Sequence, residues 1–156
     1  MGKKVLVAFD DSENAMRAVA AVADFFTNDT RVTLFHVAPD TETLCKMTSP
    51  ELIPYFKAQQ STFCTMEDKK KELVRAAMEK AKKLLVEKGF AAENVTTTLE
   101  PMKKGVARDI INEADAGYDL VIIGRRGTSG VREFFFGSTS QKVLNASKDV
   151  SVLIIS

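Results

Sequence analysis

The sequence predicts an α/β fold: an open, doubly wound parallel sheet of five strands with helices on both faces. Five short apolar or β-branched runs alternate with stretches in which apolar residues recur at helical spacing. This alternation is typical of a parallel sheet with right-handed crossovers. The length of 156 residues is that of one domain. The strand order 2-1-3-4-5 or 3-2-1-4-5 suits this pattern, and we favour 3-2-1-4-5.

The first part of the chain predicts two strands and the helix between them. The apolar run at residues 5–9 is typical of a strand buried on both faces. Ser12 is placed to cap the next helix. The apolar positions of that helix are Ala15, Ala18, Val19, Val22, Ala23 and Phe26. A β-branched run at 31–37 predicts the second strand, which Pro39 closes.

Residues 40–63 predict an irregular or partly helical insert, because prolines and scattered hydroxyls interrupt any period. Both cysteines, Cys45 and Cys64, lie in or beside this insert. The chain has no CxxC pair and a single histidine, so a protein-ligated zinc site is not expected. We expect a cytoplasmic protein whose cysteines are reduced thiols.

The second part of the chain continues the alternation. A long helix is predicted over 66–88, with its lysines on a solvated face and a packing face formed by Leu73, Ala77, Ala81, Leu84 and Leu85. A polar strand at 94–99 suits an edge of the sheet. The remaining elements are a helix at 105–114, a buried strand at 119–123, a helix at 138–146 and an apolar strand at 150–155.

Composition excludes several classes of function. The formal net charge is +1, so no bulk electrostatic field favours nucleic acid or an anionic membrane. No apolar run approaches the ~20 residues that a membrane span needs, and the first residues lack the pattern of a signal peptide. We therefore expect neither nucleic acid nor a membrane among the partners.

The stretch GRRGTSGVREFFFGSTSQKVL, residues 124–144, directly follows a buried strand. Gly124 and Gly127 would let the backbone approach an anion closely, because glycine has no side chain and adopts positive φ. Gly137 and the three hydroxyls after it would open a helix whose unpaired N–H groups attract negative charge. Arginines such as Arg126 would add positive charge. An equally simple interpretation is a glycine loop whose serine only caps the helix.

Asp10 and Gly124 are expected to meet at one crevice. Doubly wound sheets bind ligands beyond the carboxyl ends of their strands, at the point where the winding reverses. In the favoured order this point lies between the first strand, which Asp10 follows, and the fourth, which Gly124 follows. Asp10 could instead cap the first helix or form a local ion pair. We interpret His36, inside the second strand, as packed rather than catalytic.

These residues carry a resemblance to a known family. The motif Gly124-x2-Gly127-x9-Gly137-Ser138 resembles the nucleotide-binding signature of the universal stress protein family, in its ATP-binding branch. The resemblance extends over nearly the whole chain, through KVLVAFDDSENAMRAV, LFHV, GVARDIINEA, DLVIIGRRGTSG and GSTSQKVL. It implies one universal stress protein domain over 1–156, with the fold of the adenine nucleotide alpha hydrolase-like proteins.

The resemblance also implies the residues of a binding site. Adenosine would lie against Ala8, Phe9 and Asp10, and the main chain of Val37 would read the adenine edge. The phosphates and ribose would be held by the end of the fourth strand, the loop and the next helix, through Ile123, Gly124, Arg126, Gly127, Gly137, Ser138, Thr139 and Ser140. Magnesium would be held mainly by the phosphates of ATP. No catalytic residue is implied.

The expected function is that of an ATP-binding regulator or switch in the stress response. The sequence has no GxxxxGK[ST] motif and no clear catalytic base near Gly137, so an efficient enzyme is not expected. Two alternatives stay open: a slow ATP hydrolase, and a nucleotide-free dimeric module that binds another protein. A homodimer through the fifth strand, 150–155, is expected because an exposed apolar edge is an association hazard unless a copy covers it. The 40–63 insert or the C-terminus could cover this edge instead.

Overall fold

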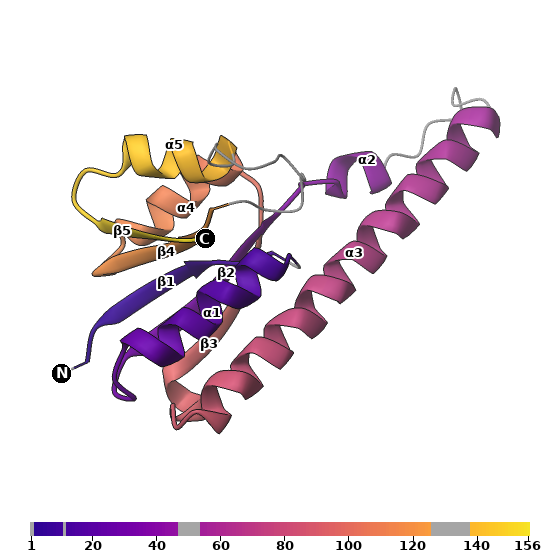
Figure 1. Cartoon of the computed structure of the whole chain (residues 1–156). Helices are drawn as coiled ribbons and strands as arrows, with labels where there is room; N and C mark the ends of the chain where they lie inside the picture. The colour runs from indigo at the N-terminus through magenta and orange to yellow at the C-terminus, as the bar shows by residue number, and fades with distance from the viewer. Residues whose placement is uncertain (1, 11, 47–53, 126–137) are drawn as a thin grey trace.

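The computed structural model describes residues 2–10, 12–46, 54–125 and 138–156. Within these ranges, five parallel strands form one sheet in the order β3-β2-β1-β4-β5, and helices cover both of its faces (Figure 1). The predicted fold class and the favoured strand order are therefore confirmed. No helix in the described ranges is both long and apolar enough to cross a membrane.

The strands lie close to the predicted runs. They are β1 (Lys4–Ala8), β2 (Arg31–Ala38), β3 (Val95–Pro101), β4 (Leu120–Gly124) and β5 (Ser151–Ile155). Parallel pairing joins β1 to both β2 and β4, so the winding reverses beside β1. The central position of β1 explains its apolar run, since Val5, Leu6 and Val7 are completely buried. As the polar sequence of β3 predicts, that strand lies at an edge.

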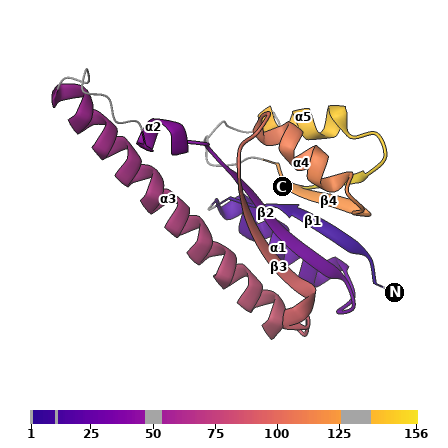
Figure 2. The ribbon, with the colours of Figure 1, turned by 180° about the vertical axis from the view of Figure 1, so that it is seen from behind.

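The helices divide into two layers. They are α1 (Glu13–Phe25), α2 (Glu42–Lys46), α3 (Pro54–Glu87), α4 (Val106–Ala114) and α5 (Ser138–Ala146), with a 3-10 turn, η1 (Ala92–Asn94). Helices α1 and α3 pack on one face of the sheet and α4 and α5 on the other, as both views show (Figures 1 and 2). The predicted cap is confirmed, because the Ala15 N–H donates to Ser12 Oγ at 3.2 Å.

The helix α3 is longer than the sequence predicts. It begins at Pro54 rather than at 66 and runs for 34 residues. Proline is tolerated in the first turn because its missing N–H has no partner there in any case. Both views show the first half of α3 projecting beyond the sheet (Figures 1 and 2). Much of the expected insert therefore consists of α2 and the start of α3.

The packing face of α3 is rotated slightly from the predicted one. Ala81 and Leu85 are buried as expected, and Val74 and Met78 are buried beside them. Leu73 was expected to pack on the sheet, but it is 61% exposed. The prediction is wrong for Leu73 alone, because Ala77 and Leu84 are partly buried against the same cluster; at this end of the face Val74 packs in place of Leu73.

The two cysteines are joined. Cys45 of α2 and Cys64 of α3 form a disulfide with a Cα–Cα distance of 5.9 Å. The expectation of reduced thiols is therefore wrong for this structure. Spacing alone did not indicate the bond, because it forms only where α2 lies against the projecting half of α3, and no apolar pattern in the sequence marks that contact.

Candidate functional site

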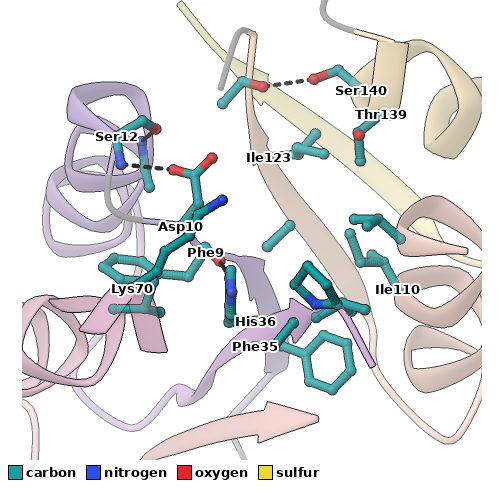
Figure 3. Close-up of a pocket in the computed structure, with 18 of the residues that line it drawn as sticks. Phe9, Asp10, Ser12, Phe35, His36, Lys70, Ile110, Ile123, Thr139 and Ser140 are labelled. Carbon is teal, nitrogen blue, oxygen red and sulfur yellow. Dashed lines mark hydrogen bonds between the residues drawn. The ribbon is translucent and has the colours of Figure 1, made fainter. Parts of the chain in front are cut away.

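A cavity of about 340 Å³ lies at the carboxyl ends of β1, β2 and β4, where the winding reverses (Figure 3). Its volume falls in the range of small-molecule sites. Three helices begin around it, since Ser12, Val106 and Ser138 line it and stand at or next to the starts of α1, α4 and α5. The unpaired N–H groups of helix starts favour negative charge.

One part of the cavity wall is apolar. It is formed by the ends of the strands and by one helical residue from each face of the sheet, namely Ala8, Phe9, Phe35, Val37, Val74, Ile110 and Ile123. Most of these side chains also belong to the two hydrophobic clusters of the core. The wall is consequently preformed, and it suits a flat ring with little charge.

Asp10 lines the cavity and lies two residues after the end of β1. Its Oδ1 accepts a hydrogen bond of 2.8 Å from the Ser12 N–H (Figure 3). This bond ties Asp10 to the start of α1. Asp10 therefore has a local structural role, as the alternative interpretation from the sequence allowed. Because this bond uses one lone pair of one carboxylate oxygen, Asp10 keeps acceptor capacity at the cavity.

His36 lines the cavity as well. Its Nδ1 lies 2.8 Å from the carbonyl oxygen of Phe9. Since a carbonyl only accepts, Nδ1 carries a proton and donates it to this hydrogen bond. The ring thus holds the end of β1 against β2, in agreement with its interpretation as a packed residue, and it adds a polar group to the cavity.

The main chain of Val37 is directed toward the crevice. The carbonyl of Phe35 accepts from the Phe9 N–H at 2.8 Å, and the carbonyl of Ala38 accepts from the Met102 N–H at 2.7 Å. Main-chain groups of successive residues in a strand point to opposite sides, so those of Val37 point toward β1. Because β1 ends at Ala8, paired with Phe35, Val37 lies beyond the regular β1 ladder.

Gly124 is required by packing inside the protein. A Cβ at this position would lie 2.9 Å from Asn14 Cβ and 3.1 Å from the Asn14 carbonyl oxygen. Contacts under 3.0 Å are too short for carbon atoms, so the close approach of β4 to α1 excludes a side chain. From the sequence, we explained this glycine by the close approach of a phosphate. The structure adds a second explanation, which is the packing of β4 against α1.

The start of α5 brings three hydroxyls to the cavity, on Ser138, Thr139 and Ser140. They do not have the same role. Ser140 is buried, and its Oγ donates to the Gly124 carbonyl at 2.7 Å (Figure 3). Its single proton is therefore used to tie α5 to the end of β4. Ser138 and Thr139 remain as candidates for contact with a ligand.

Sequence reasoning missed one wall of the cavity. Glu67, Lys70 and Lys71 of α3 line it, although these lysines were expected on a solvated face. Helical spacing could have predicted part of this wall. Positions 67 and 71 lie on the same side of α3 as Val74. Three residues of the expected site, Arg126, Gly127 and Gly137, lie outside the described residues.

A metal site made only of side chains is not present in the described ranges. No three His, Cys, Asp or Glu residues come together there as ligands of an ion. Among the described residues, the charged side chains that line the cavity are Asp10, Glu67, Lys70 and Lys71. A magnesium ion in this cavity would therefore need oxygens from a ligand.

Comparison with known proteins places the chain in a family. The family model described as the universal stress protein family matches residues 1–156. Universal stress protein YxiE of Bacillus subtilis (strain 168) is 31% identical over 150 residues, covering 94% of this chain and 95% of that protein. A universal stress protein of Mycolicibacterium smegmatis (strain ATCC 700084 / mc(2)155) is 26% identical over 151 residues, but the alignment covers 96% of this chain and only 47% of that longer relative.

Solved structures share the fold over almost their whole length. Protein MJ0577, whose biochemical function was assigned from its structure, has 26% identity and a TM-score of 0.70, with coverage of 100% and 98% of the two chains. UspA of Lactobacillus plantarum has 20% identity and a TM-score of 0.71, with coverage of 99% and 97%. With the family match over every residue and a similar protein at 31% identity, this chain belongs to the universal stress protein family.

Proposed function

We propose that the protein binds ATP with magnesium in the cavity described above and acts as a nucleotide-dependent regulator in the stress response. The observation that carries the proposal is the meeting, in one cavity, of an apolar wall and three helix starts. An adenine ring needs the first feature and a chain of phosphates needs the second. Family membership supports the regulatory role. The described residues that line the cavity include no catalytic arrangement that would favour an enzyme instead.

The adenosine part of the ligand fits the side of the cavity formed by β1 and β2. The apolar wall would hold the faces of the adenine ring, and the main-chain groups of Val37, directed toward β1, would bond its edge. The carboxylate of Asp10 is suited to accept hydrogen bonds from ribose hydroxyls, a role that acidic residues play in other nucleotide sites.

The phosphates fit the side formed by α5. The helix starts at Ser138, so its first N–H groups lack partners within the helix. Ser138 and Thr139 add hydroxyl donors, whereas Ser140 is occupied by Gly124. Magnesium would bridge phosphate oxygens, because it prefers oxygen ligands and keeps several waters. Gly127 and Gly137 would complete the phosphate site as the family resemblance implies.

Titration with ATP and magnesium tests the proposal. ATP at ~100 times its dissociation constant should raise the free energy of unfolding by about 2.7 kcal/mol, because only the folded state binds it. Isothermal titration and thermal unfolding measure this, with adenosine and GTP as controls for the phosphates and the base. No heat and no thermal shift at millimolar ATP would reject nucleotide binding. Phosphate release over hours would favour the slow hydrolase over the regulator.

Two serines of α5 give a matched pair of variants. Ser138→Ala should weaken ATP binding by roughly 1.5–3 kcal/mol, with little effect on adenosine, because its hydroxyl would bond a charged phosphate. Ser140→Ala should instead lower the free energy of unfolding by about 1–3 kcal/mol, since the buried Gly124 carbonyl loses its donor. Calorimetry and urea unfolding separate the two effects. Equal losses of ATP and adenosine affinity in Ser138→Ala would place this hydroxyl away from the phosphates.

The free edge of β5 supports a second proposal, a homodimer through this strand. Val152, Leu153, Ile154 and Ile155 are only partly buried, and within the described ranges β5 pairs with β4 on one side and with no strand on the other. The Ile155 carbonyl accepts from the Arg125 N–H at 2.7 Å, so the main chain of Ile155 and Leu153 points toward β4. By alternation, Val152 and Ile154 present their main-chain groups at the open edge.

Val152→Pro should therefore prevent dimer formation without unfolding the protein. Proline removes an N–H that points away from the sheet, a position that tolerates it. Leu153→Pro is the control, because it removes an N–H directed at β4 and should disrupt the fold. Light scattering at micromolar concentration should show twice the 17.2 kDa chain mass for the parent and a single chain for Val152→Pro. A folded Val152→Pro variant that remains dimeric would exclude this edge.

A further inference from the structure

One face of α3 contacts three different surroundings along its length. Its residues recur at spacings of three and four, so they share one side of the helix. From the N-terminal end they meet α2, then the cavity, then the core, in the order Gln60 and Cys64, Glu67 and Lys71, Val74 and Met78. Lys71 lies two turns after Cys64 and one turn before the buried Val74, so its position depends on both the disulfide and the core contact.

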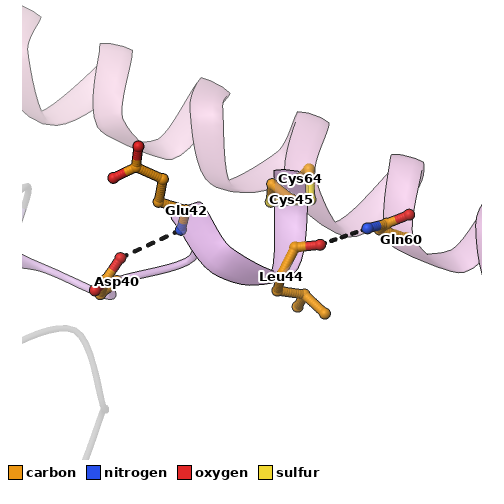
Figure 4. Close-up of a disulfide and its surroundings, with 6 residues drawn as sticks. All are labelled: Asp40, Glu42, Leu44, Cys45, Gln60 and Cys64. Atoms are coloured by element: carbon orange, nitrogen blue, oxygen red, sulfur yellow. Dashed lines mark hydrogen bonds between the residues drawn. A yellow bond between two sulfur atoms is a disulfide. The ribbon is translucent and has the colours of Figure 1, made fainter. Parts of the chain in front are cut away.

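Among the described residues, α2 is the element that contacts the projecting half of α3. Within the described residues from 54 to 66, every side chain except those of Gln60 and Cys64 is exposed. Gln60 Nε2 donates to the Leu44 carbonyl, and Cys64 is bonded to Cys45 (Figure 4). An exposed hydrogen bond contributes little to stability. The disulfide is the covalent constraint among these described contacts.

The lysines beside the cavity are available for a ligand. In the described ranges, the side chains of Lys70 and Lys71 form no hydrogen bond and no ion pair. The charge of Lys71 also reaches α2: the pKa of Glu42 is lowered mainly by its hydrogen bond and charge interaction with Lys46, and to a smaller extent by Lys71. Lys71 thus stands between α2 and the cavity, at the point where the disulfide fixes their separation.

We propose that Lys70 and Lys71 form a basic wall that binds the phosphates of the nucleotide, and that the Cys45–Cys64 disulfide holds this wall in place, so that reduction weakens phosphate binding. The inference rests on the nucleotide binding proposed above. The reductant is a dithiol, which supplies two electrons and two protons. The bond between the cysteine sulfurs breaks, two thiols form, and the sulfurs of the dithiol join in a disulfide.

The expected loss of ATP affinity on reduction follows from the entropy cost of ordering the part of α3 that carries the lysines. With the disulfide intact, the lysines are presented by a fixed helix. After reduction the bound nucleotide must itself order that segment, and immobilising a long side chain on binding weakens affinity by about two- to tenfold. Disulfides in reducing compartments are commonly transient and sense the redox state, which agrees with a bond whose loss spares the core and alters one wall of the cavity.

The first experiment compares the oxidised and the dithiothreitol-reduced protein, with thiol alkylation and mass spectrometry to verify each state. Reduction should weaken ATP–magnesium binding about three- to tenfold and leave adenosine binding within twofold. The Cys45→Ser/Cys64→Ser variant should bind like the reduced parent and ignore dithiothreitol. Hydrogen exchange should rise over 54–71 on reduction but not over 74–85. Unchanged ATP affinity in the reduced parent would overturn the inference.

The second experiment removes the lysines. Lys70→Ala/Lys71→Ala should weaken ATP binding about tenfold in the oxidised protein and adenosine binding by less than twofold. Lys69→Ala is the matched control, because Lys69 is exposed on the same turn but does not line the cavity. If the oxidised parent binds no ATP, the proposed function falls and this inference with it. If the parent binds ATP and the lysine variant binds it equally well, the inference alone is wrong.

Discussion

Leu85→Ala is expected to lower the free energy of unfolding by about 2–5 kcal/mol, whereas Leu73→Ala should change it by less than about 0.5 kcal/mol. The two leucines lie on the same helix, so the substitution has the same effect on helix propensity in both. They differ in burial: Leu85 is completely buried in the core cluster of α1, α3 and the sheet, and Leu73 is 61% exposed. Removing buried methyl groups leaves a cavity, and removing exposed ones does not.

Urea unfolding followed by circular dichroism measures this difference. The protein concentration must be the same for all variants, because association would add to the apparent stability. Val74→Ala offers a second point, since Val74 is the buried neighbour of Leu73. A large loss for Leu73→Ala with a small one for Val74→Ala would restore the helix face that the sequence predicts and would reject the register of α3 in the structure.

Gly124→Val should also be strongly destabilising, by about 1–3 kcal/mol, because overpacking forces neighbouring groups to move. Its Cβ would lie 2.9 Å from Asn14 Cβ and 3.1 Å from main-chain atoms of Asn14. The neighbour is partly backbone, so rotation of the Asn14 side chain cannot relieve the contact. Either α1 or the end of β4 must shift, and both border the cavity, so ATP binding should fall too.

Gly124→Ala is the graded control for this prediction. It adds the same Cβ without the two further methyl groups, so its destabilisation should be present but smaller. Urea unfolding and ATP titration are needed for both variants. If ATP binding is lost while the free energy of unfolding is unchanged, Gly124 is required by the ligand alone, and the packing role inferred from Asn14 is wrong.

The sheet was predictable because its strands carry their signal locally. Val5, Leu6 and Val7 are buried on both sides of the sheet, and such strands appear in a sequence as continuous apolar runs. The helix at 138–146 was predicted with the bounds that α5 has. Where an element packs on the core with one regular face, its periodicity is present in the sequence.

The first half of α3 escaped prediction for the same physical reason. Helical periodicity arises from burial of one face, and residues 54–66 have almost no buried face. Their apolar side chains are exposed instead, as Tyr55, Phe56, Phe63 and Met66 show. A helix of this kind leaves no amphipathic pattern, and the disulfide that anchors it depends on a contact between two such weakly patterned segments.

The candidate site was predictable at the strand ends and less so on its helical wall. Asp10 and Gly124 follow apolar runs, and topology alone brings them together. Lys70 and Lys71 depend on how far α3 extends past the sheet and on its rotation about its axis. Ser140 and Ser138 differ in role because the Ser140 hydroxyl donates a hydrogen bond to Gly124, whereas Ser138 remains a candidate for ligand contact. No spacing in the sequence specifies this bond.

The pairing of β1 with both β2 and β4 has a consequence for the growing chain. Val5 pairs with Val32 and also with Leu120, so one neighbour of the central strand emerges early from the ribosome and the other much later. Non-local pairing of this kind slows folding. Until residues 120–124 have been made, β1 keeps one edge open, and a nascent chain that ends just before that point would have β1, β2 and β3 but no crevice in which to hold a ligand.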